Sequence, residues 1–150
     1  QNGEAQEMPL PRVPLYIVNT GKPQSTTGEA VSSVARRFAA SHPVWDGFET
    51  VVNHMQKALL HDDLKGFQKA MRDNHRLLNE IGVVPGRVCD FVSEVEQAGA
   101  AAKICGAGAV TGDNAGMVLV AARETPTELC AKYGYEIMTV RPDPLGVRLV

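Results

Sequence analysis

Apolar residues in this chain recur with two different periods, and the changes from one period to the other mark the predicted secondary structure. Short, mostly apolar runs predict strands at 13–19, 101–105, 117–122, 135–140 and 147–150. Apolar residues spaced three and four positions apart predict helices at 26–41, 45–59, 64–81, 85–98 and 127–133. Both element types are therefore expected along the whole chain.

Residues typical of helix N-termini support these boundaries. A hydroxyl at Ser25 or Thr26, followed by Glu29, is typical of the start of a helix. Thr125 or Thr127 is expected to cap the last helix in the same way.

The order of the predicted elements is β-α-α-α-α-β-β-α-β, followed by one short strand. If the extra helices are treated as insertions, this order resembles the ferredoxin-like β-α-β-β-α-β arrangement. We therefore predict an α+β fold, in which an antiparallel sheet carries helices on one face and inserted helices are added. The pattern leaves the order of the strands open.

Composition excludes several classes of protein. The chain has 150 residues, enough for one domain with a single core. Its 15 basic and 17 acidic residues give a net charge of −2 without a basic run, so no nucleic-acid partner is expected. No apolar stretch could span a bilayer and no signal peptide is recognisable, so we expect no membrane contact and a cytoplasmic location. Cys89, Cys105 and Cys130 lack a C-x-x-C pair and are expected to be buried thiols.

A glycine-rich segment joins the strands at 101–105 and 117–122. It begins Gly106-Ala107-Gly108 and has glycine again at 112 and 116. The simpler interpretation is a glycine-rich connection between two strands. The connection is long for a hairpin, however, and its consecutive backbone N–H groups suit an anion such as a triphosphate. Both interpretations stay open, because the segment matches neither the P-loop nor the G-x-G-x-x-G pattern.

A second cluster of polar residues follows the first strand. Asn19, Thr20, Lys22 and Ser25 place amide, hydroxyl and ammonium groups between a strand end and a helix N-terminus. That position suits a small anion, but it is equally explained by an ordinary strand end and helix cap. No Ser-His-Asp set, metal-ligand quartet or carboxylate pair is apparent, so no catalytic residue and no metal ligand is predicted. His75 is expected to occupy a polar helix position.

Four segments together resemble one known family. IVNTGKPQST (17–26), NHRLLNEIGV (74–83), AKICGAG (102–108) and PLGVRLV (144–150) are similar to the C-terminal half of the mevalonate kinases, within the GHMP kinase superfamily. The resemblance implies that residues 1–150 form a GHMP kinase C-terminal domain, and that the N-terminal domain with the catalytic residues is absent from this chain. It also implies an ATP-dependent phosphorylation of mevalonate in isoprenoid precursor synthesis.

The resemblance assigns residues to two binding sites. The element beside the ATP phosphates is matched by Gly106, Ala107, Gly108 and Ala109. In the family this element usually continues with more glycines, whereas a bulkier loop follows it in this sequence. Asn19, Thr20, Lys22 and Ser25 are the expected substrate-binding residues, with Thr20 matching a threonine at the mevalonate pocket.

The resemblance also implies cofactors and partners. ATP and Mg²⁺ are the expected cofactors, with the Mg²⁺ ligands supplied by the N-terminal half. That half is the expected partner, in the same chain or as a separate one, and a homodimer is left open. Two alternatives stay open as well: another GHMP kinase, acting on phosphomevalonate or homoserine, or a stand-alone small-ligand binding module without catalysis.

Overall fold

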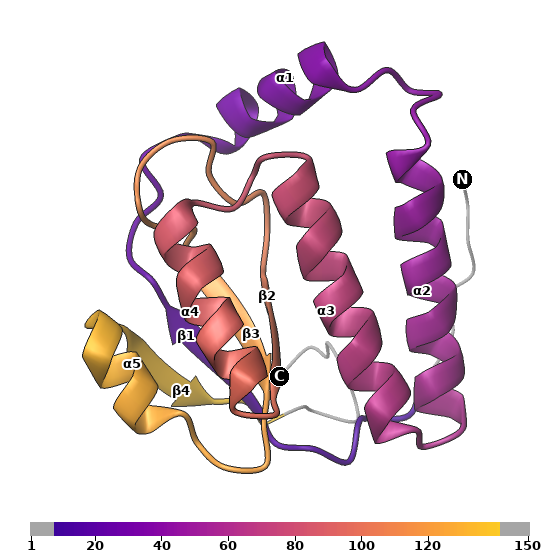
Figure 1. The fold of residues 1–150 in the computed structure, drawn as a ribbon, viewed down its shortest axis with the longest axis vertical. Helices are drawn as coiled ribbons and strands as arrows, with labels where there is room; N and C mark the ends of the chain where they lie inside the picture. The colour runs from indigo at the N-terminus through magenta and orange to yellow at the C-terminus, as the bar shows by residue number, and fades with distance from the viewer. Residues whose placement is uncertain (1–7, 142–150) are drawn as a thin grey trace, which may run out of the picture.

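The computed structural model describes residues 8–141, and the predicted strand at 147–150 lies outside them. Nine elements follow one another in this range: β1 (Leu15–Asn19), α1 (Thr27–Arg37), α2 (Val44–Leu60), α3 (Leu64–Glu80), α4 (Gly86–Gln97), β2 (Ala101–Ile104), β3 (Met117–Ala121), α5 (Thr127–Tyr133) and β4 (Glu136–Thr139) (Figure 1). Each helix and strand that the periodicity predicts within 8–141 is present.

The four strands form one antiparallel sheet in the order β2-β3-β1-β4. Val18 of β1 pairs with Val118 of β3 on one side and with Ile137 of β4 on the other. Because β1 and β2 are both antiparallel to β3, they run in the same direction. Their C-terminal ends therefore lie along the same side of the sheet, which is called the shared edge below. The predicted α+β fold class is confirmed, and this shared edge positions the segments that follow β1 and β2.

Two groups of buried side chains hold the helices on the sheet. Helices α4 and α5 pack on the face that carries Val18 and Val118, and Phe91 of α4 is completely buried there. Helices α2 and α3 pack against each other, and α3 lies along the edge strand β2. Phe67 and Met71 of α3 contact a second cluster that includes Ala101 of β2.

Helix α1 lies outside these layers, across the end of the molecule that contains the β2–β3 loop (Figure 1). Ala30 is its only buried residue, and Val31 is 60% exposed. Thr26 caps the helix as predicted, because its hydroxyl accepts the N–H of Glu29 while the Glu29 carboxylate accepts the N–H of Thr26. At the other end, Arg37 donates to the carbonyl of Ile81 at 3.2 Å. The helix is thus capped at its N-terminus and bonded to the end of α3 at its C-terminus.

Two sequence predictions need correction. Helix α5 begins at Thr127 after Pro126, and no side chain caps it, so the predicted threonine cap is wrong. The backbone N–H of Thr127 instead donates to the carbonyl of Thr125. Only Cys130 is a buried thiol, whereas Cys89 and Cys105 are half-buried.

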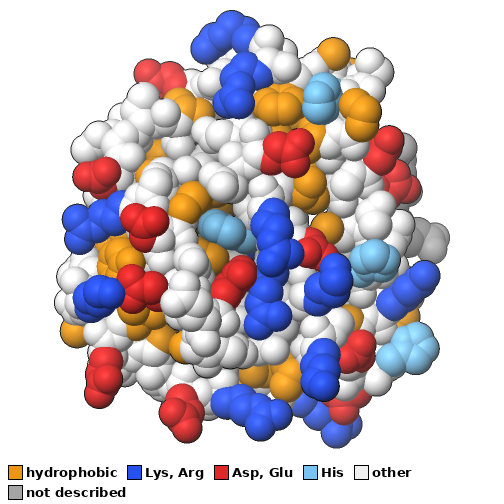
Figure 2. All heavy atoms as spheres, in the orientation of Figure 1, with side chains coloured by type: hydrophobic (Ala, Val, Ile, Leu, Met, Phe, Trp, Pro, Cys, Tyr) orange, Lys and Arg blue, Asp and Glu red, His pale blue; other side chains and the backbone are white. Residues whose placement is uncertain are grey.

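Charged side chains of both signs are interspersed over the face shown in Figure 2. Such a mixed surface does not present one continuous basic area on this face. Among the helices of residues 8–141, none combines the length and the apolar character needed to cross a membrane.

Candidate functional site

The segment after β1 and the loop after β2 are joined by hydrogen bonds at the shared edge of the sheet. Thr20 is 4% exposed, and its hydroxyl donates to the carbonyl of Gly116 at 2.8 Å. The same hydroxyl accepts the N–H of Ala115 at 3.0 Å. Thr20 therefore fixes the end of the loop that leads into β3, in addition to its predicted place at the substrate pocket.

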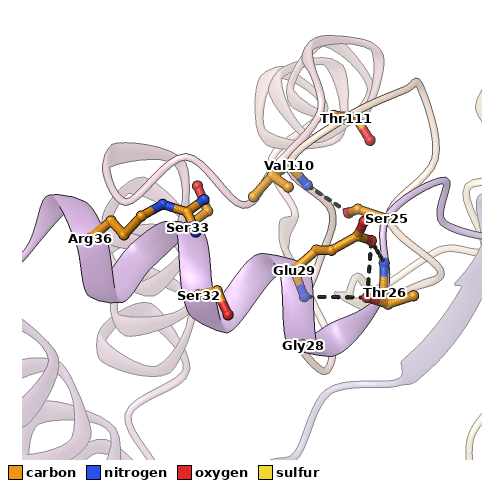
Figure 3. A pocket seen from close by; sticks show the side chains of 9 residues that line it. All are labelled: Ser25, Thr26, Gly28, Glu29, Ser32, Ser33, Arg36, Val110 and Thr111. Atoms are coloured by element: carbon orange, nitrogen blue, oxygen red, sulfur yellow. Dashed lines mark hydrogen bonds between the residues drawn. The ribbon is translucent and has the colours of Figure 1, made fainter.

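Ser25 makes a similar bond near the start of the same loop. Its side chain is buried, and its hydroxyl accepts the N–H of Val110 at 2.9 Å (Figure 3). Segment 20–25 and loop 105–116 thus meet at two side-chain hydroxyls, although they are far apart in the sequence.

Gly106-Ala107-Gly108 forms a tight turn whose ends are fixed by main-chain bonds. The N–H of Cys105 donates to Met117 at 2.7 Å, and the N–H of Ala109 donates to Val83 at 2.9 Å. Gly106 and Gly108 have φ values of +75° and +66°, which favour glycine. No residue within 8–141 accepts the N–H groups of Gly106, Ala107 and Gly108. Three successive free donors at a glycine turn are the arrangement that binds phosphate groups.

The remaining predicted residues lie at the rim of the site. The Asn19 side chain accepts the N–H of Gly21 at 3.0 Å and contacts the Glu136 carboxylate at 3.4 Å. Lys22 is exposed, and within 8–141 its ammonium group forms no ion pair. The structure therefore brings Thr20 and Ser25 to the glycine loop, whereas the side chains of Asn19 and Lys22 stay apart from it.

Two hollows lie on opposite sides of α1. A polar hollow of about 600 Å³ is lined by Ser25, Ser33 and Arg36 of the α1 region and by Val110 and Thr111 of the loop (Figure 3). An apolar hollow of about 700 Å³ is lined mainly by apolar side chains and by the start of the glycine turn: Val31, Val34, Phe38, Trp45, Gly106 and Ala107. Of the predicted site residues, Ser25 and the loop residues after Ala109 thus face one side of α1, whereas Gly106 and Ala107 face the other.

Sequence reasoning missed two groups that shape this site. Arg36 lines the polar hollow together with Ser32 and Ser33. It lies four positions after Ser32, so the helical spacing in the sequence already placed the two side chains on one face of α1. The Val83 carbonyl, which holds Ala109, had no such signal because the two residues belong to different elements.

His75 lies on α3, the helix on which it was predicted to occupy a polar position, but it is buried. It is 7% exposed, and its Nδ1 atom has no hydrogen-bond partner within 8–141. Burial, together with the nearby charges of Arg76 and Lys103, lowers the pKa of His75 to about 4. Its imidazole is therefore neutral near pH 7.

No group of three or more His, Cys, Asp or Glu side chains in the described part of the chain could hold a metal ion.

The fold and the site define a class: an α+β domain whose glycine turn has three N–H groups without an acceptor among residues 8–141, in a loop that is bonded to the capped end of a helix. The model of the family described as GHMP kinases C terminal matches residues 55–112. The predicted resemblance to a GHMP kinase C-terminal domain is confirmed, and the chain has the fold of that domain.

Solved structures of similar fold come from several kinases. The mevalonate kinase of L. major, solved with R-mevalonate, is 23% identical with a TM-score of 0.71, over 89% of this chain and 42% of that one. The Streptococcus pneumoniae phosphomevalonate kinase, solved with phosphomevalonate and AMPPNP, is 13% identical with a TM-score of 0.73, over 91% and 42%. The Methanococcus jannaschii mevalonate kinase is 23% identical with a TM-score of 0.68, over 85% and 39%.

The chain thus spans 39–42% of the length of these three proteins. No sequence of a curated protein matches it.

Proposed function

We propose that this chain is the C-terminal domain of a mevalonate kinase-like enzyme, which transfers the γ-phosphoryl group of ATP to a hydroxyl of mevalonate. An N-terminal half completes the site and supplies the catalytic residues and the Mg²⁺ ligands. The observation that carries this proposal is the glycine turn at Gly106, Ala107 and Gly108, whose free N–H groups lie in a domain with the GHMP kinase fold.

In this proposal the chain contributes positioning and charge stabilisation. The three N–H groups donate to phosphate oxygens of ATP, as fixed dipoles that need no reorganisation during the transfer. Asn19, Thr20, Lys22 and Ser25 border the acceptor side, and the ammonium group of Lys22 is available to a carboxylate because it is exposed. Mg²⁺, held by the other half, supplies further neutralisation of phosphate charge.

A second candidate substrate is phosphomevalonate. A phosphorylated acceptor needs more positive charge near residues 19–26 than Lys22 alone supplies. Arg36 lines the same polar hollow as Ser25, from the other end of α1 (Figure 3), and no ion pair holds it within residues 8–141. With Arg36 at this hollow, the site offers a phosphorylated acceptor more positive charge than Lys22 alone, the one cation that the sequence shows at residues 19–26.

The test is a phosphotransfer assay on the polypeptide that joins this domain to its N-terminal half. ADP release is measured with mevalonate, phosphomevalonate and homoserine in parallel, at equal protein concentration. Turnover with mevalonate supports the first proposal, and a preference for phosphomevalonate supports the second. The isolated 150-residue chain is the control and is expected to show no turnover. A natural polypeptide without a preceding domain, and without activity on any acceptor, would instead favour a binding module.

A further inference from the structure

Loop 105–116 has three anchors next to its glycine turn, and they differ in kind. The N–H groups of Cys105 and Ala109 donate to main-chain carbonyls, which are the same whatever side chain is present. The N–H of Val110 donates to a side chain, the hydroxyl of Ser25. Of these three anchors, the bond from Val110 to Ser25 is therefore the one that a substitution of the accepting residue can remove.

The anchor is itself held rigidly. Ser25 is 8% exposed and directly precedes Thr26, the N-cap of α1. Reciprocal bonds between Thr26 and Glu29 fix that residue, at 2.7 Å and 3.2 Å. The hydrogen bonds to Thr26 also hold the pKa of the Glu29 carboxyl below its usual value, which keeps this carboxylate ionised. A capped helix end thus presents the Ser25 hydroxyl to the loop.

The direction of the free N–H groups depends on these anchors. Val110 follows Ala109 directly, so the Ser25–Val110 bond supports the Ala109–Val83 bond from the far side of the turn. Within 8–141, loss of the Val110 bond would leave the bond from Ala109 to Val83 as the one main-chain hydrogen bond that holds the turn on this side. Phosphate binding by backbone donors requires that they converge before the ligand arrives, because ordering the loop afterwards costs free energy. A loose Val110 would weaken binding by the turn while leaving its atoms unchanged.

We infer that Ser25 is a positioning residue for the phosphate-binding turn, acting through the Val110 amide rather than by contact with the acceptor substrate. This inference rests on the proposed function, and it moves Ser25 from the substrate side of the site to the ATP side. It also couples the two sides, since Ser25 and Thr20 belong to one segment and both hold the same loop.

The test compares Ser25→Ala with Ser25→Thr in the polypeptide that joins both halves. Ser25→Ala removes the acceptor and is expected to raise the KM for ATP about five- to tenfold, with the KM for the acceptor unchanged within a factor of about two. Ser25→Thr keeps the hydroxyl, and the polar hollow beside it has room for the added methyl group, so the KM for ATP should stay near the wild-type value. Ser93→Ala is the matched control, because the Ser93 hydroxyl also accepts a hydrogen bond, from Gln97, away from the loop.

Hydrogen exchange supplies a readout that does not need turnover. In the wild type, MgATP should slow amide exchange in peptides covering 105–112, and Ser25→Ala should abolish much of that protection. A rise in the KM for the acceptor with an unchanged KM for ATP would overturn the inference and return Ser25 to the substrate pocket. Absence of MgATP protection in the wild type would overturn it too. Protection by MgATP that is lost in Ser25→Ala, without turnover of any acceptor, would contradict the proposed function while supporting the role of Ser25.

Discussion

The carbonyl of Val83 lies against the glycine turn and accepts the N–H of Ala109 at 2.9 Å. The same carbonyl occupies the position that a Cβ atom at Gly108 would take, next to the side chain of Ile104. Gly106, by contrast, has no atom within 4 Å of an added Cβ. The two glycines of the turn therefore serve different purposes: Gly108 permits close packing, and Gly106 leaves an open surface.

Gly106→Ala tests the phosphate-binding role of the turn. The new methyl group fits without a clash inside the domain, but it stands on the open surface where phosphate is proposed to approach. We expect a several-fold rise in the KM for ATP, together with a stability loss of about 1–2 kcal/mol from the left-handed backbone. Steady-state kinetics and thermal melting of the two-domain polypeptide measure the two effects.

Gly134→Ala is the matched control for that backbone cost. Gly134 has φ +70°, close to the +75° of Gly106, and an added Cβ there also meets nothing within 4 Å. The two variants should lose similar stability, whereas only Gly106→Ala should impair the use of ATP. Equal ATP kinetics in both would mean that the turn is a plain connection between strands.

Gly108→Ala should mainly destabilise the fold. The Cβ atom would displace the Val83 carbonyl, break its bond to Ala109 and strain a positive φ, so the free energy of unfolding should fall by more than about 2 kcal/mol. Urea unfolding of the 150-residue chain checks this, with Gly106→Ala as the milder reference. A loss no larger than that of Gly106→Ala would show that the packing on Val83 is unimportant.

Thr20→Val keeps the shape of the side chain and removes its hydroxyl. Both the Gly116 carbonyl and the Ala115 N–H lose this partner, so we expect a destabilisation of about 1–3 kcal/mol even without ligand. Thr50→Val serves as control, because Thr50 is exposed and, within 8–141, its hydroxyl donates to the Asp46 carbonyl of its own helix. If Thr20→Val melts like the wild type, the hydroxyl does not hold the loop.

The buried His75 predicts a pH dependence of stability. Its pKa is about 4 in the folded chain, below the ordinary histidine value of 6.5. Above about pH 6.5 both states are neutral and His75 contributes no dependence on pH. Between about pH 6.5 and 4 only the unfolded chain binds the proton, so stability should fall by up to about 3 kcal/mol and then level off. His75→Leu should reduce this slope in urea titrations at several pH values, while His54→Leu, at an exposed position, should not.

The sequence by itself determined the elements and the class of fold, because the signals are local. Apolar residues three or four positions apart define one helix face, and Thr26 and Glu29 cap α1 across a single turn. The glycines of the turn at 106–108 were also visible, since positive φ is a property of single residues. Such interactions span few residues, and their partners can be read side by side in the chain.

The tertiary structure alone decided the strand order and how the site is assembled. Ser25 and Val110 are 85 positions apart, and nothing in either local pattern names the other as its partner. The threonine cap predicted for α5 failed because the chain enters that helix through Pro126, with Thr125 offering its carbonyl in place of its hydroxyl. His75 was predicted to fill a polar position on its helix because its neighbours along α3 are polar, yet it is buried in a helix that packs against both α2 and β2. Contacts of this kind depend on how elements pack in three dimensions, and the free energy that selects one packing is a property of the whole core.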